Sequence, residues 1–323
     1  MGAVLAVDLG GTSMRAARTE ADGAVGHRCE VPTPRTPDAT PLIALMRQVL
    51  GAGTVDAAVV GVPGRVDYGT GRLEHAPNLP RGWAAELTED GLSRRLGIEV
   101  ALANDADLAA VGEAWFGAGR SYRDVAYLTV STGIGAGVVT GGLLVHGRRS
   151  LAEVGHTIVD WRGMASGRAT VEQLGSGTAL RVLAAEAGLD ADGEEVERLR
   201  RAGDPIASMV WDGVVTVAGA AAVNIAQLFT PDVIVVGGGV GLVGEAVLGP
   251  MRDLLAAWGP VGLPAPIDVV NASLGDDAAL AGAAAWSRAF SPEAASRPLE
   301  ARRPGDFGRS QGSGPVPPSE PAR

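Results

Sequence analysis

Three glycine-rich segments follow directly after apolar runs that are typical of buried strands, at residues 8–12, 131–137 and 237–239. Glycines allow backbone N–H groups to approach a phosphate chain closely, and the Thr12 hydroxyl can add a hydrogen bond. Asp8 is placed to hold a magnesium ion through water, because magnesium keeps much of its hydration shell. The third segment would let a flat adenine or ribose lie against the backbone. Each segment is also compatible with an ordinary turn.

Polar side chains that could belong to a functional site stand at three further places. Asn104 and Asp105 come where an apolar run gives way to a helical pattern, the usual location of functional groups in an α/β sheet. Asp105 could act as a base, although without further context a helix cap is the favoured reading. Glu153 and His156 stand close together with no cysteine nearby, so hydrogen bonds to a polyol are favoured over a metal. Glu172 precedes a Gly-Ser-Gly turn and indicates nothing alone.

The composition excludes several chemistries. The chain contains no lysine, so all 27 of its basic residues are arginines. This excludes a lysine-bearing P-loop, a Schiff-base enzyme and a kinase that grips phosphate with a strand lysine. Cys29 is the only cysteine, which excludes intrachain disulfides and fits a reducing cytosol. The net charge of −10 argues against electrostatic binding of nucleic acid or of an anionic membrane over a broad surface.

No membrane or secretion signal is expected. The N-terminal apolar run stops at Asp8 and carries no basic stretch, so it is not a signal peptide. Asn224 and Gln227 interrupt the best candidate for a membrane span, and no uninterrupted apolar run reaches the ~20 residues that a bilayer requires. We therefore expect a buried helix there and a cytoplasmic protein.

The first half is predicted to open with an antiparallel meander, because three strand-like runs are joined by short, turn-rich segments. A dinucleotide-binding fold would need a helix directly after its first glycine turn, and none fits there, so that fold is excluded. The expected strands lie at 4–7, 14–18, 25–31, 55–62 and 100–102, and the expected helices at 41–50, 87–96 and 106–115.

The second half begins in the same way, with a strand, a glycine turn and a returning strand, which indicates a structural duplication. A loop is expected over 147–177, and residues from 291 onward are expected to form a disordered tail. The remaining predicted strands lie at 125–130, 136–140, 233–236 and 267–270, and the helices at 178–187, 194–201, 205–229, 250–258 and 277–290.

These residues together resemble the ROK sugar kinases (repressor, open reading frame, kinase), most closely their bacterial glucokinase branch. The similarity covers about residues 3–288 and depends on eight blocks in the family's order. The blocks are DLGGTSMRAA at 8–17, GVPGRVDYGTGRLEHAPNLPRGW at 61–83, NDADLAAVGEAWFGAG at 104–119, TVSTGIGAGVV at 129–139, EVGH at 153–156, EQLGSG at 172–177, PDVIVVGGGV at 231–240 and LGDDAALAGAA at 274–284.

The resemblance implies an actin-like (ribonuclease H-like) α/β ATPase fold with two domains around a central cleft. Residues 1–117, completed by a C-terminal helix at 277–290, would form one domain and 118–276 the other. The implied phosphate-binding residues are Asp8, Gly10, Gly11, Thr12, Ser131, Thr132, Gly133 and Gly135, and the adenosine wall is Gly237, Gly238 and Gly239. The implied sugar-binding residues are Gly64, Asn78, Asn104, Asp105, Glu153, His156 and Glu172.

The implied reaction is transfer of a phosphoryl group from Mg·ATP to a hexose, in the first place to O6 of glucose. Asp105 would be the general base that accepts the hydroxyl proton. Because lysine is absent, transition-state charge would fall on magnesium, backbone amides and Arg15. The expected partners are a sugar and a nucleotide, with neither nucleic acid nor membrane, and a homodimer is a family expectation.

One departure from the family is large. ROK kinases usually follow the glutamate–histidine motif with a cysteine-rich loop that binds structural zinc together with the histidine. The corresponding segment here, residues 161–172, contains no cysteine. We therefore expect no structural zinc and a His156 that is free to bind a sugar hydroxyl. Ser13 and Ser131 are smaller departures beside the phosphate loops.

Other readings of the same family stay open. The donor could be polyphosphate, since polyphosphate-using glucokinases also lack the cysteine loop, and the acceptor could be fructose, mannose or N-acetylmannosamine. The protein could also bind sugar with little turnover. A sugar-sensing repressor is disfavoured, because such proteins carry an N-terminal helix-turn-helix domain, whereas this sequence opens on its first kinase strand.

Overall fold

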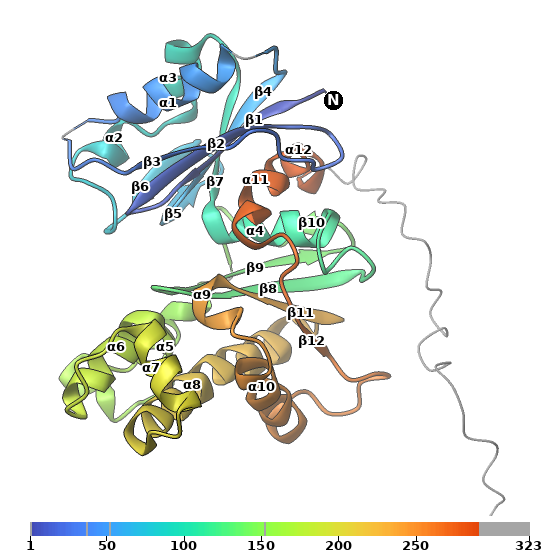
Figure 1. Ribbon diagram of the computed structural model, residues 1–323. Coiled ribbons are helices and arrows are strands. Elements are labelled where there is room, and N and C mark those ends of the chain that lie inside the picture. The colour runs from blue at the N-terminus through green and yellow to red at the C-terminus, as the bar shows by residue number, and fades with distance from the viewer. Residues whose placement is uncertain (1, 37, 52, 152, 291–323) are drawn as a thin grey trace, which may run out of the picture.

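The computed structural model describes residues 2–290 except 37, 52 and 152. The predicted disordered tail, 291–323, lies outside the described residues. The chain forms two five-stranded sheets, with helices on the outer face of each and further helices between them (Figure 1).

The first sheet has the strand order β3-β2-β1-β4-β7. β1 is antiparallel to β2 and parallel to β4, and β7 continues the parallel part. The apolar runs of β1 and β4 are buried almost throughout, as expected for parallel strands that are covered on both faces. The strands are β1 (Val4–Leu9), β2 (Ser13–Thr19), β3 (Cys29–Pro32), β4 (Ala57–Val62) and β7 (Val100–Asn104), and the outer helices are α1 (Thr40–Leu50) and α3 (Glu89–Leu96).

The second sheet repeats this arrangement, with the order β10-β9-β8-β11-β12 and the same sequence of antiparallel and parallel pairs. The predicted duplication is therefore present in the topology. The strands are β8 (Asp124–Val130), β9 (Ile134–Thr140), β10 (Leu143–Leu144), β11 (Val233–Gly237) and β12 (Asp268–Asn271).

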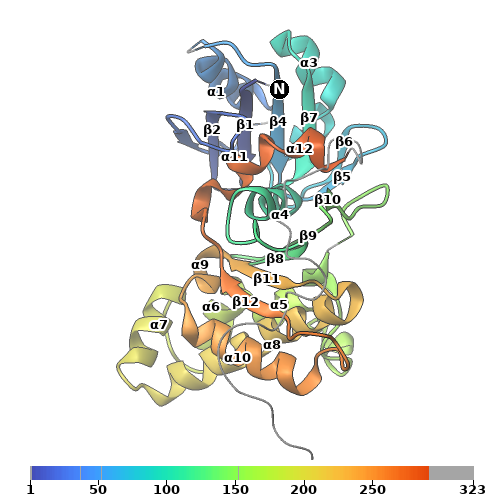
Figure 2. The same cartoon turned by 90° about the vertical axis from the view of Figure 1, so that its right-hand side faces the viewer.

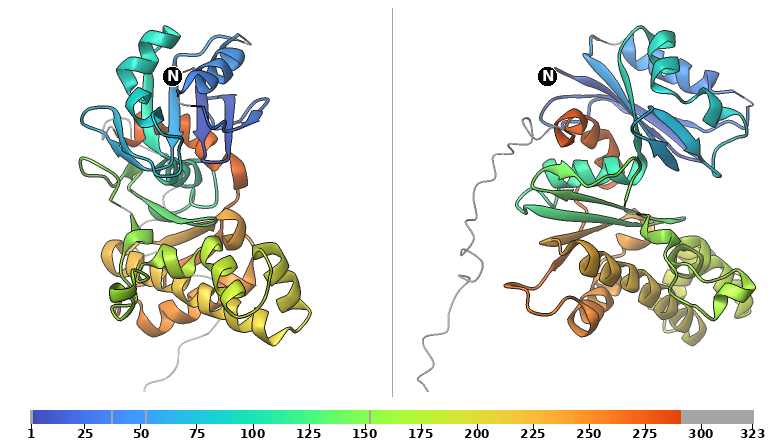
Figure 3. Two further views of the ribbon diagram at one scale, coloured as in Figure 1. Left: turned by 90° about the vertical axis from the view of Figure 1, so that its left-hand side faces the viewer. Right: turned by 180° about the vertical axis from the view of Figure 1, so that it is seen from behind.

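Helices from the second half pack on the outer face of the second sheet, at the opposite end of the molecule from α1 and α3 (Figure 3). α8 (Pro205–Phe229) is long and apolar enough to cross a membrane, but Trp211, Val214 and Ile225 lie in this core. It is therefore a core helix, as predicted. The other helices of this half are α5 (Val171–Gly175), α6 (Gly177–Glu186), α7 (Gly193–Arg201), α9 (Gly238–Gly241) and α10 (Glu245–Trp258).

Two helices, α4 (Asp105–Trp115) and α11 (Ala278–Ala283), lie between the sheets (Figure 2). They cross closely because each presents a glycine to the other. A side chain at Gly112 would collide with the carbonyl oxygen of Ala278, and one at Gly282 with that of Leu108. α4, α11 and the inner faces of both sheets share one hydrophobic core, so α4 is fixed relative to both halves.

Several predicted elements differ from the structure. The hairpin of β5 (Arg65–Asp67) and β6 (Arg72–His75) and the short helix α2 (Trp83–Glu86) were not predicted, and the 147–177 loop contains α5 and two 3-10 turns. β3 begins at Cys29 rather than at residue 25. The single helix expected at 277–290 is wrong, since a 3-10 turn, α11 and α12 (Trp286–Ala289) take its place.

α10 begins at Glu245, five residues before the predicted start, with Pro250 inside it. Proline cannot donate a hydrogen bond to the carbonyl four residues earlier. That carbonyl, of Ala246, instead accepts a hydrogen bond from Trp211 Nε1 at 3.4 Å. A tertiary contact therefore compensates for the proline, which sequence pattern alone does not show.

The crossing of α4 and α11 gives a testable prediction. We expect Gly282→Val to lower the free energy of unfolding by about 1–3 kcal/mol, because the new side chain would push α11 from α4. Urea unfolding followed by circular dichroism measures the change. The control is Gly213→Ala in α8, where a methyl group meets no atom within 4 Å and a stabilisation of about 0.5–1 kcal/mol is expected. Equal stability of Gly282→Val and the parent would contradict the packing argument.

Candidate active site

Parallel strands of the first sheet bring the predicted polar residues to one edge. Asp8 in β1 is paired with Gly61 in β4, and Gly61 is paired with Ala103 in β7, two residues before Asp105. A Cβ atom at Gly61 would lie 3.8 Å from the Cα atom of Asp105 and 3.4 Å from the carbonyl oxygen of Val7. The glycine therefore allows the first residue of α4 to approach β1 and Asp8.

Asp105 is half-buried at this edge. Burial, together with the negative charge of Asp8, raises the pKa of the Asp105 carboxyl to about 7, although the backbone N–H of Ala106 opposes the rise. That N–H donates to Asp105 Oδ1 at 2.9 Å. A carboxyl group with a pKa near neutrality is matched to general-base catalysis at physiological pH.

Asn104 joins Asp105 to the segment around Gly64. Its Oδ1 atom accepts hydrogen bonds from the backbone N–H groups of Ala106 at 3.0 Å and Asp107 at 3.1 Å, which caps α4. Its Nδ2 atom donates to the carbonyl oxygen of Gly64 at 2.9 Å. Gly64 has a φ of 128°, and a side chain there would collide with the carbonyl of His75. The capping role is therefore filled by Asn104 and not by Asp105.

The first glycine loop is held by Thr33 and lies against Asn78. Thr33 Oγ1 donates to the carbonyl oxygen of Gly10 at 2.7 Å, and the Thr33 N–H donates to the carbonyl oxygen of Thr12 at 2.8 Å. A Cβ atom at Gly11 would lie 2.9 Å from the carbonyl oxygen of Asn78. A predicted sugar-binding residue therefore borders a predicted phosphate loop.

Arg15 is paired with carboxylates beside this loop. Its guanidinium lies 3.6 Å from Asp8, 3.3 Å from Glu30 and 3.5 Å from Asp276. Burial raises the pKa of Asp8, and the positive charge of Arg15 opposes that effect. Arg15 therefore stabilises the charged form of Asp8 in this structure.

The second glycine loop connects β8 to β9 and is anchored by α6. The N–H of Gly177 donates to the carbonyl oxygen of Ser131 at 2.7 Å, and Thr178 Oγ1 donates to that of Thr132 at 2.8 Å. A Cβ atom at Gly135 would lie 3.1 Å from the Cβ atom of Ala106. The start of β9 therefore meets the N-terminus of α4, next to Asp105.

Glu153, His156 and Glu172 gather around the start of β9. Glu172 Oε2 accepts a hydrogen bond from the N–H of Ile134 at 2.9 Å. Gly155 packs so tightly on the carbonyl of Ile134 that a side chain there would collide with it. His156 Nε2 lies 3.7 Å from Glu153 Oε2, and the His156 side chain is 65% exposed. The structure therefore brings together side chains that are distant in the sequence.

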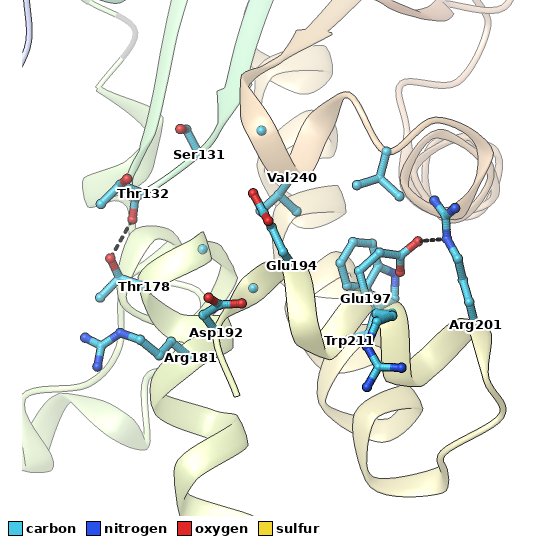
Figure 4. A pocket seen from close by; sticks show the side chains of 15 residues that line it. Ser131, Thr132, Thr178, Arg181, Asp192, Glu194, Glu197, Arg201, Trp211 and Val240 are labelled. Atoms are coloured by element: carbon cyan, nitrogen blue, oxygen red, sulfur yellow. Dashed lines mark hydrogen bonds and ion pairs between the residues drawn. The ribbon is translucent and has the colours of Figure 1, made fainter. Parts of the chain in front are cut away.

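A cavity of about 680 Å³ extends from the second glycine loop towards α7 and α8 (Figure 4). Of the three glycines predicted to form the adenosine wall, Gly239 lines it. A side chain at Gly237 would collide with the ring of Tyr127. Gly238 has a φ of 81° and packs against the Val130 carbonyl. Packing therefore leaves no room for a side chain at either of these two positions.

Residues of α6, α7 and α8 that line this cavity were not predicted. Glu197 is paired with Arg201 at 2.6 Å, and the neighbouring Trp211 forms part of the wall (Figure 4). The pattern of α7 is that of any exposed, charged helix, so it gave no signal. The unpredicted lining residues are Gly177, Thr178, Arg181, Asp192, Gly193, Glu194, Glu197, Arg198, Arg201, Trp211, Val240 and Val243.

Asp107 is a further residue that sequence reasoning missed. Burial raises its pKa to about 7, and hydrogen bonds from Tyr68 and Ser150 oppose that effect. It looked like an ordinary acidic residue in the first turn of a helix, where acids are common. Its burial depends on two distant segments that the sequence does not place beside it.

The segment that replaces the cysteine loop is held by hydrogen bonds. Gln173 Oε1 accepts from the backbone N–H groups of Ala169 at 3.0 Å and Thr170 at 3.2 Å, and Gln173 Nε2 donates to the carbonyl oxygen of Gly167 at 2.9 Å. Arg168 pairs with Glu186 at 2.8 Å. Within the described residues, no three histidine, cysteine or acidic side chains are grouped so that they could hold a metal ion.

Comparisons with known proteins agree with this geometry. The ROK family profile matches residues 4–289. The glucokinase of Streptomyces coelicolor is 34% identical over 318 residues, covering 90% of this chain and 99% of that protein. The glucokinase of Thermotoga maritima is 32% identical over 304 residues, covering 87% and 96%.

A solved structure extends the similarity to three dimensions. A ROK family glucokinase from Streptomyces griseus, in complex with glucose and AMPPNP, superimposes with a TM-score of 0.74 at 32% identity, covering 88% of this chain and 99% of that chain. The expected actin-like fold is thereby confirmed. With both halves included in the similarity, the chain belongs to the ROK family, in its branch of glucokinase-like sugar kinases.

Proposed function

We propose that the protein phosphorylates a hexose, glucose at O6, with Mg·ATP as the donor and Asp105 as the general base. The observation that carries this proposal is the position of Asp105, at the edge where Asp8, Gly61 and the start of β9 converge. The related glucokinase with glucose and AMPPNP bound supports the choice of substrates.

The sugar is proposed to lie between the two halves. Its pocket would be formed by Gly64, Asn78, Asn104 and Asp105 from the first half, and by Glu153, His156 and Glu172 from the second. The hydroxyl oxygen attacks the γ-phosphorus as its proton passes to the Asp105 carboxylate. The bond from that phosphorus to the β–γ bridging oxygen breaks, and ADP leaves. Alignment of the two substrates supplies much of the rate enhancement.

The nucleotide is proposed to lie in the cavity beside the second glycine loop, where Gly239 and Trp211 would border the nucleoside. The phosphates would then reach the backbone N–H groups of both glycine loops. The phosphate-binding set is that implied by the family, namely Asp8, Gly10, Gly11, Thr12, Arg15, Ser131, Thr132, Gly133 and Gly135. With no lysine in the chain, these amides and Arg15 would carry the protein's share of charge stabilisation.

The carboxyl groups of Asp8 and Asp105 also fit a magnesium ion. Asp8 raises the pKa of Asp105 by charge repulsion, and a cation near Asp8 would relieve that repulsion. Magnesium would supply charge neutralisation on the transferred phosphoryl group, with Asp8 holding it through water.

We further propose a cytoplasmic protein with small-molecule partners and a homodimeric state. The proposed domains are 1–117 with 277–290, and 118–276.

Removing the base tests the mechanism. Asp105→Asn is expected to lower kcat for glucose by at least about two orders of magnitude, because the hydroxyl loses its proton acceptor. A coupled kinase assay with ATP and with polyphosphate, across glucose, fructose, mannose and N-acetylmannosamine, measures this and selects donor and acceptor. The control is Asp253→Asn, an exposed acid in α10, which should behave as the parent. Undiminished turnover of Asp105→Asn would remove Asp105 from the mechanism.

The raised pKa of Asp105 predicts a pH-dependent difference in stability. Between pH 3.8 and about pH 7, the folded state binds more protons than the unfolded state. This carboxyl therefore destabilises the fold progressively as the pH rises through that interval. Above pH 7, Asp105→Asn should therefore be more stable than the parent by at least on the order of 1 kcal/mol, the equivalent of one pKa unit. Thermal unfolding from pH 4 to pH 8 measures this gain, which should vanish near pH 4. A constant difference would contradict the assignment.

Metal content provides a third test. Because Cys29 is the only cysteine and residues 161–172 are held by hydrogen bonds, purified protein should contain far less than one zinc per chain. Elemental analysis measures this, and a zinc chelator should leave the thermal midpoint unchanged. One zinc per chain, or a lower midpoint with the chelator, would show that the segment binds metal after all.

A further inference from the structure

Asp107 is completely buried although it is ionisable. Both oxygens of its carboxyl group accept a hydrogen bond, Oδ2 from the hydroxyl of Tyr68 at 2.7 Å and Oδ1 from the hydroxyl of Ser150 at 3.0 Å. Side chains two residues apart on a helix do not face each other, so Asp107 leaves α4 on a different side from Asp105. Asp107 therefore acts on other protein groups and not on a substrate.

The first donor comes from the first half of the chain. Tyr68 lies in the connection between β5 and β6, and its hydroxyl oxygen also accepts a hydrogen bond from the N–H of Asn104 at 3.2 Å. Its ring packs edge-on against His146, Trp286 and Phe290, with centroid distances of 5.5–5.9 Å. Gly64 precedes this hairpin and Asn78 follows it. Tyr68 therefore ties a proposed sugar-facing segment to α4.

The second donor comes from the second half. Ser150 lies three residues before Glu153, in the segment that follows β10. In the same segment, Arg148 pairs with Asp67 at 2.6 Å, and its carbonyl oxygen accepts a hydrogen bond from the N–H of Tyr68 at 2.9 Å. The segment that leads to Glu153 and His156 is therefore fastened to the hairpin and to α4.

A buried carboxyl group is costly unless its hydrogen bonds are made, and hydrogen bonds require a defined geometry. An apolar side chain would fill the same space without fixing the two segments relative to each other. We propose that Asp107 is a positioning residue that, through Tyr68 and Ser150, holds the two sugar-facing segments at a fixed separation and so sets the affinity for the sugar. This inference rests on the proposed function, because it takes the sugar pocket from it.

Tyr68→Phe tests the inference, because it removes the hydroxyl and keeps the aromatic packing. We expect the KM for the sugar to rise about tenfold, which is near the upper end of the net contribution of a single intramolecular hydrogen bond. The KM for ATP should stay unchanged and kcat should stay within about threefold of the parent, since neither Asp105 nor the nucleotide cavity is touched. Ser150→Ala should show the same pattern.

Tyr122→Phe is the matched control. Its hydroxyl also donates to a carboxylate, Asp268 Oδ2 at 2.8 Å, but it lies outside this network. It should leave the sugar KM at the parental value. If Tyr68→Phe fails to fold, Ser150→Ala decides alone. Parental sugar affinity in the variants that fold, or a fall in kcat with an unchanged sugar KM, would overturn the inference.

Calorimetric titration of the sugar without a donor separates the two proposals. A parent protein that binds a hexose but transfers no phosphate would refute the proposed function. The comparison of sugar affinity between the parent, Tyr68→Phe and Ser150→Ala would still decide the role of Asp107. Weaker binding in the two variants supports it, and equal binding refutes it.

Discussion

The position of α4 between the two sheets is the constraint on which the site depends. The helix packs against α11 through Gly112 and Gly282 and against β9 through Gly137, where any side chain would collide with the helix. Because interiors are close-packed, these contacts leave the helix little freedom to shift. Its first residue, Asp105, is thereby placed at the edge of the first sheet and beside the start of β9. The close packing of small residues therefore positions a polar residue of the proposed site.

The charged side chains near the start of this helix are carboxylates and arginine, since the chain contains no lysine. Asp8 and Asp105 repel each other, and Arg15 is shared among Asp8, Glu30 and Asp276. Because carboxylates outnumber cations here and would repel a nucleotide, we propose that backbone N–H groups, Arg15 and a magnesium ion together meet its phosphates. The two glycine loops provide such groups, and each is braced from outside by threonine, through Thr33 in the first and Thr178 in the second.

Hydrogen bonds and ion pairs hold the proposed sugar-binding residues of the second half, where residues 161–172 contain no cysteine. Gln173 and Arg168 hold the segment before Glu172, and Glu172 supports the second glycine loop through Ile134. On the other side, Arg148 and Ser150 fasten the segment before Glu153 to the first half. We propose that directed hydrogen bonds and ion pairs hold this segment in place of the metal ligands that the resemblance to ROK kinases implies.

The sequence by itself determined the fold class, the duplicated strand–turn–strand units and the blocks that identify the family, because glycine turns and buried apolar runs follow from local patterns. It also located Asp105 at a strand–helix junction. It could not show the β5–β6 hairpin, the cavity wall from α7, or the burial of Asp107 by Tyr68 and Ser150. Those features depend on contacts between segments far apart in the chain, and only close packing of the folded halves decides which side chains meet.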